Sequence, residues 1–376
     1  MELASSLPSW NPLRFDGTEL PTELTILVKV LALVVLLVNH VRILPDPWLP
    51  FVPGIDRLPP ILFQKTLQTV FVVAALAILF NRRVRLASLV LGTTMLLAVV
   101  SSKAYYGNNK TFCGLMFFLT GLHVPGRKPW TLQWQLGITY FGAGLNKVLD
   151  VDWHSGVFFQ NWAVQRLHQP WYMALDAVLP RMALARLMCW TTIITELGVV
   201  PAIFIPRLQY WAICANILFQ SGLLLFTGTT FTLFFYSMSA ASLAFVTWPT
   251  GRVTALYDDD SPFVNRLQKL LRFCDADGRI NWTPRSGHTG DWLRLATEKR
   301  TYCNFRALRM VVLLNPITYL VIAGLIAAAG DLPTAATDRR MVVALCLFFL
   351  MPPLASILDR FLGRRQTDRI AATEMG

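Results

Sequence analysis

The amino-acid sequence predicts an all-α, polytopic membrane helical bundle of about ten spans, with a small α/β insertion on its cytoplasmic side. The 376 residues are 54% hydrophobic and only 15% charged, whereas a soluble domain carries about 25% charged residues. Apolar runs of nearly membrane-spanning length recur along the chain, and the mean hydropathy is +0.48. One stretch, 249–309, interrupts these runs with charged residues, Pro and Gly.

The apolar runs divide the chain into three expected domains. These are a transmembrane bundle at 1–248, a cytoplasmic insertion at 249–309, and a C-terminal pair of spans with a basic tail at 310–376. The fourth run is short and polar where it begins, so we expect it to be either re-entrant or held by neighbouring helices. The expected spans are 24–44, 61–80, 86–101, 111–124, 132–149, 184–205, 208–226, 229–248, 310–330 and 341–361.

The basic residues predict the orientation, because cytoplasmic loops of membrane proteins carry an excess of Lys and Arg. Four basic groups fall on one side if both termini are cytoplasmic: Arg82 to Arg85, Arg127 with Lys128, the 249–309 segment, and the arginines from 360 to 369. We therefore expect a multi-pass protein of the inner cell membrane. The first apolar run follows a polar stretch with no small-residue cleavage site, which predicts no cleaved signal peptide.

The net charge, the cysteines and the histidines limit which partners and cofactors we expect. The net charge is +12, but Lys and Arg of a membrane protein meet anionic headgroups, so we expect membrane lipids and not nucleic acid as a partner. No two of the six cysteines have C-x-x-C spacing, and we interpret them as small core residues. The five histidines include no i, i+4 pair, which predicts no metal site.

The segment between the fifth and sixth spans, 153–183, is too polar to cross a membrane and too aromatic for a plain linker. It contains Trp153, Trp162, Trp171, Tyr172 and two histidines. A polar segment that is rich in Trp and Tyr favours the interface between water and lipid. We therefore expect an interfacial amphipathic helix here.

Lys147 ends the fifth apolar run, and an ionisable group at membrane depth needs a partner or a function. Two interpretations are open. Lys147 could extend to the headgroups and pair with Asp150, or it could be desolvated in a pocket and act as a base. Tyr140, Gly144 and Lys147 follow Gly137 at helical spacing on one face. Small residues at 142–144 would let a neighbouring helix approach closely.

Two further spans carry polar residues inside apolar sequence. Glu196 lies in the middle of 184–205, where a carboxylate is either functional or half of a structural ion pair. Asn216 and Gln220 are i, i+4 on the next span. Their amides hydrogen-bond but do not exchange a proton near neutral pH, which favours a role in helix packing over one in catalysis.

The region around Lys147 also resembles a known family. The stretch is similar to the hallmark of the vitamin K-dependent γ-carboxylase superfamily, whose bacterial members carry the HTTM domain, and the similarity covers about residues 20–250. A second pattern that recurs in the superfamily is a Glu-Leu pair followed by Pro and then Arg. It is similar to Glu196-Leu197 with Pro201 and Arg207 in this chain. The residues that carry the hallmark are Tyr140, Phe141, Ala143, Gly144, Lys147, Asp152, Trp153 and Gly156.

The resemblance implies an integral membrane enzyme that acts on a quinol, vitamin K-like, or on another lipid-soluble substrate. It would be carboxylase- or epoxidase-like, a lyase or oxidoreductase. Lys147 would be the intramembrane base and Glu196 its polar partner. A peptide or a small molecule would be the further substrate. The residues that the resemblance nominates for cofactor binding are Tyr140, Gly144, Lys110, Trp153, Gln220 and Asn216.

Two departures from the family pattern support an alternative function. Lys110 stands after Asn108 and Asn109 where the animal carboxylases have a histidine, and Gln220 follows Phe219 where the family often has one. These replacements argue against carboxylation of glutamate. They favour a non-catalytic membrane scaffold, or a partner that handles peptides or lipids, for example in peptide maturation. The retained hallmark and Glu196 favour the enzyme.

The pattern of the insertion at 249–309 predicts half of a thioredoxin-like βαβ unit. Its elements are a strand that ends near Tyr257, a helix, a turn and a second strand at 280–284. It resembles the start of the DCC thiol-oxidoreductase-like family, which opens with Tyr-Asp-Gly-Asp-Cys-Pro-Phe-Cys. Ser261 and Val264 occupy the places of the two cysteines. Because a thiolate is the nucleophile in dithiol exchange, we expect a degenerate unit without that activity.

Overall fold

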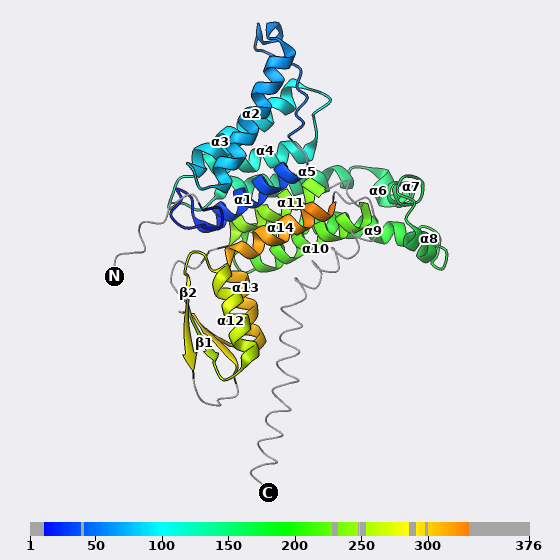
Figure 1. Ribbon diagram of the computed structural model, residues 1–376. Coiled ribbons are helices and arrows are strands. Elements are labelled where there is room, and N and C mark those ends of the chain that lie inside the picture. The colour runs from blue at the N-terminus through cyan, green and yellow to red at the C-terminus, as the bar shows by residue number, and fades with distance from the viewer. Residues whose placement is uncertain are drawn as a thin grey trace.

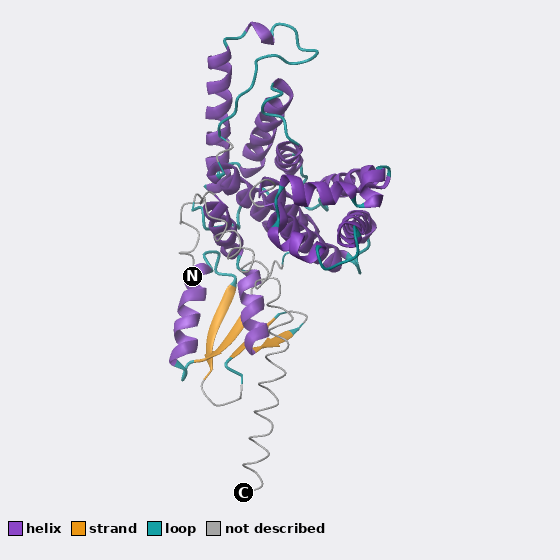
Figure 2. Ribbon diagram, turned by 90° about the vertical axis from the view of Figure 1, so that its right-hand side faces the viewer, coloured by secondary structure: helices purple, strands orange, loops and turns teal. Residues whose placement is uncertain are grey.

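The computed structural model describes residues 11–38, 41–227, 232–246, 248, 253–285, 291–297 and 300–330. These residues form a mostly helical body with one small sheet beside it, as the sequence predicted (Figures 1 and 2). The bundle helices are α1 (Thr22–Leu37), α2 (Pro60–Leu79), α3 (Val84–Ser101), α4 (Asn108–Gly121), α5 (Trp130–Val148), α9 (Ala183–Phe204), α10 (Gln209–Thr227), α11 (Thr232–Ala241) and α14 (Pro316–Gly330), with short 3₁₀ turns at Ile55–Arg57 and Ser242–Phe245.

The prediction of about ten spans is not confirmed. By length and composition, three described helices could cross a membrane, namely α2, α3 and α9, and a bent pair, α13 (Asn304–Leu314) with α14, would make a fourth. Helices do lie at the other expected positions up to residue 330, but α1 has 16 residues and α4 has 14. The expected span 341–361 lies outside the described residues. Apolar composition alone does not separate a lipid-facing span from a short helix buried in a bundle.

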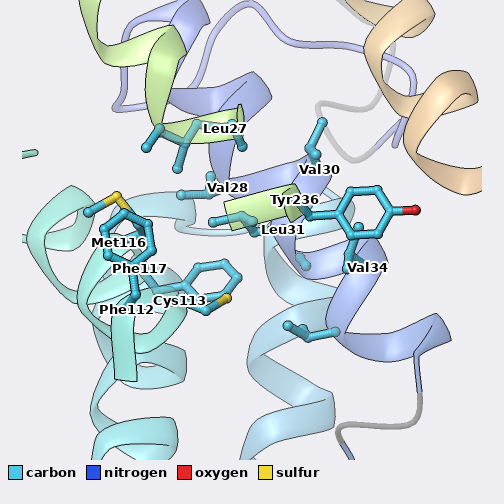
Figure 3. Close-up of a cluster of buried hydrophobic side chains, with 14 of the residues drawn as sticks. Leu27, Val28, Val30, Leu31, Val34, Phe112, Cys113, Met116, Phe117 and Tyr236 are labelled. Atoms are coloured by element: carbon cyan, nitrogen blue, oxygen red, sulfur yellow. The ribbon is translucent and has the colours of Figure 1, made fainter. Parts of the chain in front are cut away.

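Helix α1 is the central element of the bundle. Figure 3 shows Leu27 and Leu31 of α1 beside Phe112 and Phe117 of α4, with Tyr236 of α11 close by. All of these side chains belong to one buried apolar cluster. A helix that is apolar on most of its surface is mostly buried, which explains why α1 is central although it is short; its one lysine, Lys29, is buried as well.

The expected span 310–330 is broken at Asn315. Helices α13 and α14 meet there at 78°. Asn315 has an extended backbone, with φ −92° and ψ 110°, and Pro316 begins the next helix. The ring of a proline disfavours helical conformation in the residue before it, so Pro316 explains the break. As a result α13 packs on the sheet while α14 packs on α1.

The segment expected to be one interfacial helix is instead four short ones. They are α6 (Val151–Ser155), α7 (Val157–Asn161), a π-helical turn at Trp162–Arg166 and α8 (Pro170–Asp176). Gly156 separates the first two with φ +85°, and a Cβ atom there would lie 2.8 Å from the backbone nitrogen of Arg186. Only glycine adopts this conformation without strain and leaves room for α9. The break therefore lets the segment fold back against α9.

The insertion contains the predicted βαβ unit. Strands β1 (Val253–Asp258) and β2 (Ile280–Arg285) are parallel and are joined by α12 (Pro262–Cys274). Strands β3 (Leu293–Ala296) and β4 (Thr301–Cys303) complete an antiparallel edge, and the order is β2-β1-β3-β4. Helices α12 and α13 contribute to one apolar cluster with the inward residues of β1 and β3. Val264 is buried in the first turns of α12.

The segment before α1 ties the sheet unit to the bundle. The Asp277 carboxylate accepts the backbone N–H of Phe15 at 3.1 Å, and the Arg14 and Arg279 guanidinium groups lie 3.8 Å from it. Arg279 also pairs with Asp16. Charge-assisted hydrogen bonds of this kind are stronger than neutral ones. The sheet unit is thus held to the bundle by an ion cluster.

The interpretation of the cysteines as small core residues holds for two of the five that the structure describes. Cys113 and Cys189 are buried, Cys214, Cys274 and Cys303 are partly buried, and all five are free. Cys346 lies outside the described residues.

Candidate functional site

Lys147 and Glu196 form an ion pair between α5 and α9. The Lys147 Nζ atom lies 2.7 Å and 2.9 Å from the two carboxylate oxygens of Glu196, and 3.3 Å from the carbonyl oxygen of Ala143. The side chains are 17% and 8% exposed. Asp150, the other partner considered for Lys147, instead caps α6 by accepting the N–H of Asp152 at 2.9 Å. The lysine therefore points into the protein toward α9.

Gly144 allows α5 and α9 to approach closely enough for this pair. A Cβ atom at Gly144 would lie 2.7 Å from the Leu197 side chain and 3.4 Å from Cβ of Glu196. A distance under 3.0 Å would force the neighbouring side chain to move. Small residues at helix contacts bring backbones together in membranes. Gly144 thus lets Glu196 on α9 lie close to α5, within reach of Lys147.

Trp153 covers the ammonium group of Lys147. Its ring centroid lies 4.9 Å from Nζ, within the range of a cation–π interaction. Trp153 also stacks on Phe158 of α7, with centroids 4.4 Å apart. The short helix α6 follows α5 directly, so the chain folds over its own lysine. The ammonium group is therefore surrounded by a carboxylate, a carbonyl and an aromatic face.

Tyr140 belongs to a second buried cluster, with α10 and α11. Its hydroxyl donates to Oδ1 of Asn216 and accepts from Nε2 of Gln220 at 2.9 Å. Asn216 in turn donates to the carbonyl of Met238 at 2.9 Å and to Oγ of Ser242 at 2.6 Å. Tyr140, Asn216 and Gln220 are all at most 2% exposed. The Oε1 atom of Gln220 is buried but has no hydrogen-bond partner among the described atoms.

The residues nominated from the sequence fall into three places. Lys147, Glu196, Gly144 and Trp153 form the ion-pair cluster. Tyr140 with Asn216 and Gln220 forms the amide cluster, seven residues away on α5, or about 10 Å along the helix. Lys110 lies apart from both. Its Nζ donates to the carbonyl of Tyr105 at 2.9 Å and lies 3.9 Å from the ring centroid of that residue.

Several participants were not foreseen from the sequence. The Ala143 carbonyl, Phe158, the Met238 carbonyl and Ser242 all contact the two clusters. Backbone carbonyls and a lone serine have no distinctive spacing, so only the packing of α5 against α9 and α11 identifies them. A stacked aromatic next to Trp153 could have been suspected from the aromatic richness of 153–171.

The two charges of the Lys147–Glu196 pair lie in mostly buried surroundings. Each charge compensates the other, and a buried charge that lost its partner would be strongly unfavourable. The two groups share a short hydrogen bond, 2.7 Å between Nζ of Lys147 and a carboxylate oxygen of Glu196. Lysine and glutamate side chains are both among the residue types that act as general acids and bases in enzymes.

A metal is not needed to explain either cluster. Within the described ranges, one group of carboxylates, Asp258 to Asp260, has oxygens within 4.8 Å of one another. It lies at the end of β1, in the sheet unit, and two of its three residues are exposed. Consecutive acidic residues in a turn commonly have this spacing without an ion.

Comparison with known proteins identifies one domain. The family model of the HTTM domain matches residues 119–248, which contain both clusters and exclude Lys110. The match does not extend to the insertion, so its resemblance to the DCC family is not confirmed. No curated protein and no solved structure matches the chain. Residues 119–248 are therefore similar to the HTTM domain, and this match together with the apolar helices indicates a membrane protein.

Proposed function

We propose that this protein is a membrane enzyme that binds a quinol or another lipid-soluble hydroxyl compound and removes its proton with Lys147. The observation that carries the proposal is the Lys147–Glu196 pair, 2.7 Å apart and mostly buried. Intramembrane ionisable residues mark functional sites by default. The HTTM domain also occurs in vitamin K-dependent carboxylase-like proteins, which supports a quinol as substrate.

The proposed step uses the pair as a proton acceptor. When the shared proton lies on the carboxylate of Glu196, the Nζ atom of Lys147 has a free electron pair. A substrate hydroxyl next to Nζ then transfers its proton to the amine, and the substrate anion remains beside the new ammonium group. That ammonium stabilises the anion in surroundings of low dielectric constant. Glu196 thus controls whether Lys147 is a base or a cation.

The surroundings suit an aromatic diol. Trp153 offers a ring face next to Nζ, and it is stacked on Phe158, so its orientation is held. Near Tyr140, the unpaired Oε1 atom of Gln220 on α10 is an acceptor for a second polar group. Lys110 is engaged by Tyr105 and has no described contact with Lys147. We therefore assign Lys110 no part in the proton transfer.

The proposal is tested with a short-chain naphthohydroquinone under anaerobic conditions, using purified protein in detergent. Binding is measured with radiolabelled compound, and ionisation of the bound hydroxyl by its absorbance difference spectrum. Lys147→Arg is the matched variant, because arginine keeps the charge opposite Glu196 but does not lose a proton. We expect wild type to bind and ionise the compound, and Lys147→Arg to bind it without ionising it. The quinol proposal would be refuted if the wild type showed no saturable binding of the hydroquinone.

A second function is supported by a different feature of the same site. Lys147 already has a carboxylate, a carbonyl and an aromatic face as partners, so its charge is balanced without a ligand. A closed ion pair of this kind suits a non-catalytic scaffold, or a partner that handles peptides or lipids. If Lys147→Arg keeps every activity found in cells while the wild type binds no hydroquinone, the scaffold function is favoured.

We also propose a location and orientation. The protein would lie in the cell membrane with both termini and the 249–309 segment in the cytoplasm. Support comes from Arg82, Arg83 and Arg85 in the α2–α3 turn and from the basic residues of the insertion, which fall on one side in this arrangement.

A further inference from the structure

An open groove runs between α2 and α3, away from the ion-pair and amide clusters. These helices lie side by side and extend beyond the rest of the bundle (Figure 1). The groove has a volume of about 550 Å³. Its walls are apolar, from Val73 and Ala77 of α2 and from Leu86 and Val90 of α3. Val73 is 60% exposed and Leu86 is 51% exposed.

The groove is about as long as one leaflet of a bilayer is thick. Both α2 and α3 are among the helices long and apolar enough to cross a membrane. The lining residues on α2 and its C-terminal turn extend from Thr69 to Asn81, or about 18 Å along a helix. The hydrocarbon layer of one leaflet is about 15 Å thick. An acyl chain in the groove would therefore extend from the headgroup level to about the middle of the membrane.

The end of the groove at the α2–α3 turn is positively charged. Arg82 and Arg83 both line it and are exposed. Neither forms an ion pair within the described part of the chain. Arg85, in contrast, donates from Nε to the carbonyl of Gly121 at 3.1 Å and is occupied in joining α3 to α4. Two unoccupied guanidinium groups at headgroup level are suited to bind a phosphate.

We propose that the α2–α3 groove binds an anionic phospholipid, with one acyl chain between Val73 and Leu86 and the phosphate between Arg82 and Arg83. The apolar walls of the groove would contact the acyl chain. The positive charge at one end of the groove would favour an anionic headgroup over a zwitterionic one. The site is separate from Lys147 and does not depend on the proposed enzymatic function.

The experiment is a titration of the purified protein in detergent, followed by native mass spectrometry. Phosphatidylglycerol is compared with phosphatidylcholine of the same chains and with glycerol phosphate, which has the headgroup chemistry but no chain. We expect saturable binding of phosphatidylglycerol at least tenfold tighter than that of either comparison compound. Equal affinity for phosphatidylcholine would overturn the headgroup assignment, and equal affinity for glycerol phosphate would overturn the role of the groove.

Two variants of the groove and one control variant test where the lipid binds. Arg82→Gln with Arg83→Gln should weaken phosphatidylglycerol binding about as much as exchanging the headgroup does. Arg127→Gln with Lys128→Gln, which removes the same charge from another exposed turn, should leave binding unchanged. Val73→Trp fills the groove from an exposed position and should also weaken binding. Melting curves in detergent establish that each variant is folded. Undiminished binding by both the Arg82 and Arg83 double variant and Val73→Trp would place the lipid elsewhere.

Discussion

Removing Lys147 or Glu196 singly should cost more stability than removing both. Two unit charges about 3 Å apart attract by about 6 kcal/mol at an effective dielectric constant of about 20. Desolvation of both groups offsets most of this gain, and Lys147 retains 17% of its side-chain exposure. We therefore expect a coupling of about 1–3 kcal/mol between Lys147→Met and Glu196→Gln.

The assay is the free energy of unfolding by denaturant in detergent, for the wild type, the two single variants and the double variant. The partly exposed pair of Asp291 and Arg294, 3.0 Å apart in the sheet unit, is the control, and its two changes should couple more weakly because ion pairs open to solvent contribute little. Additivity at Lys147 and Glu196 would refute the reasoning. It would mean that water or lipid headgroups compensate each charge when the other is absent.

Three further predictions concern other parts of the molecule. Lys269→Cys, on the exposed face of α12, should be labelled by a membrane-impermeant reagent in inverted vesicles only, and labelling in intact cells would reverse the proposed topology. Tyr140→Phe should destabilise the protein by about 1–3 kcal/mol, because it removes the partner of Oδ1 of Asn216 and of Nε2 of Gln220, whereas exposed Tyr210→Phe should be nearly neutral in the same unfolding assay. Asp277→Ala should lower the melting temperature by detaching the sheet unit from the segment before α1, and Asp259→Ala, at an exposed position, should leave it unchanged.

The sequence predicted the positions of helices better than their relation to the membrane. The apolar runs at 61–80 and 184–205 became α2 and α9, and both remain candidate spans. The run at 24–44 became α1, a short helix at the centre of the bundle. Hydropathy reports that a segment avoids water, and protein and lipid both satisfy that requirement. The break at Asn315 was present in the sequence as Asn-Pro, and the run of apolar residues around it concealed the signal.

The sequence also predicted only part of the candidate site. Helical spacing placed Tyr140, Gly144 and Lys147 on one face of α5, and an intramembrane charge required a partner. Two carboxylates were available for that partner, and the choice of Glu196 over Asp150 follows from tertiary structure. Grouping Lys110 with the other candidates came from family resemblance, and in the structure its nearest partner is Tyr105.

By itself, the sequence determined that this chain is rich in membrane-type helices, that it carries a βαβ insertion without paired cysteines, and that Lys147 and Glu196 need compensation for their charges. These properties depend on local composition and on spacing along one element. Only the tertiary structure decided which charges meet, that Trp153 folds over Lys147, and that Tyr140 joins two amides from a helix some 75 residues away. Such contacts depend on how closely two helices approach, and between α5 and α9 the close approach is allowed by Gly137 and Gly144, which face side chains of α9.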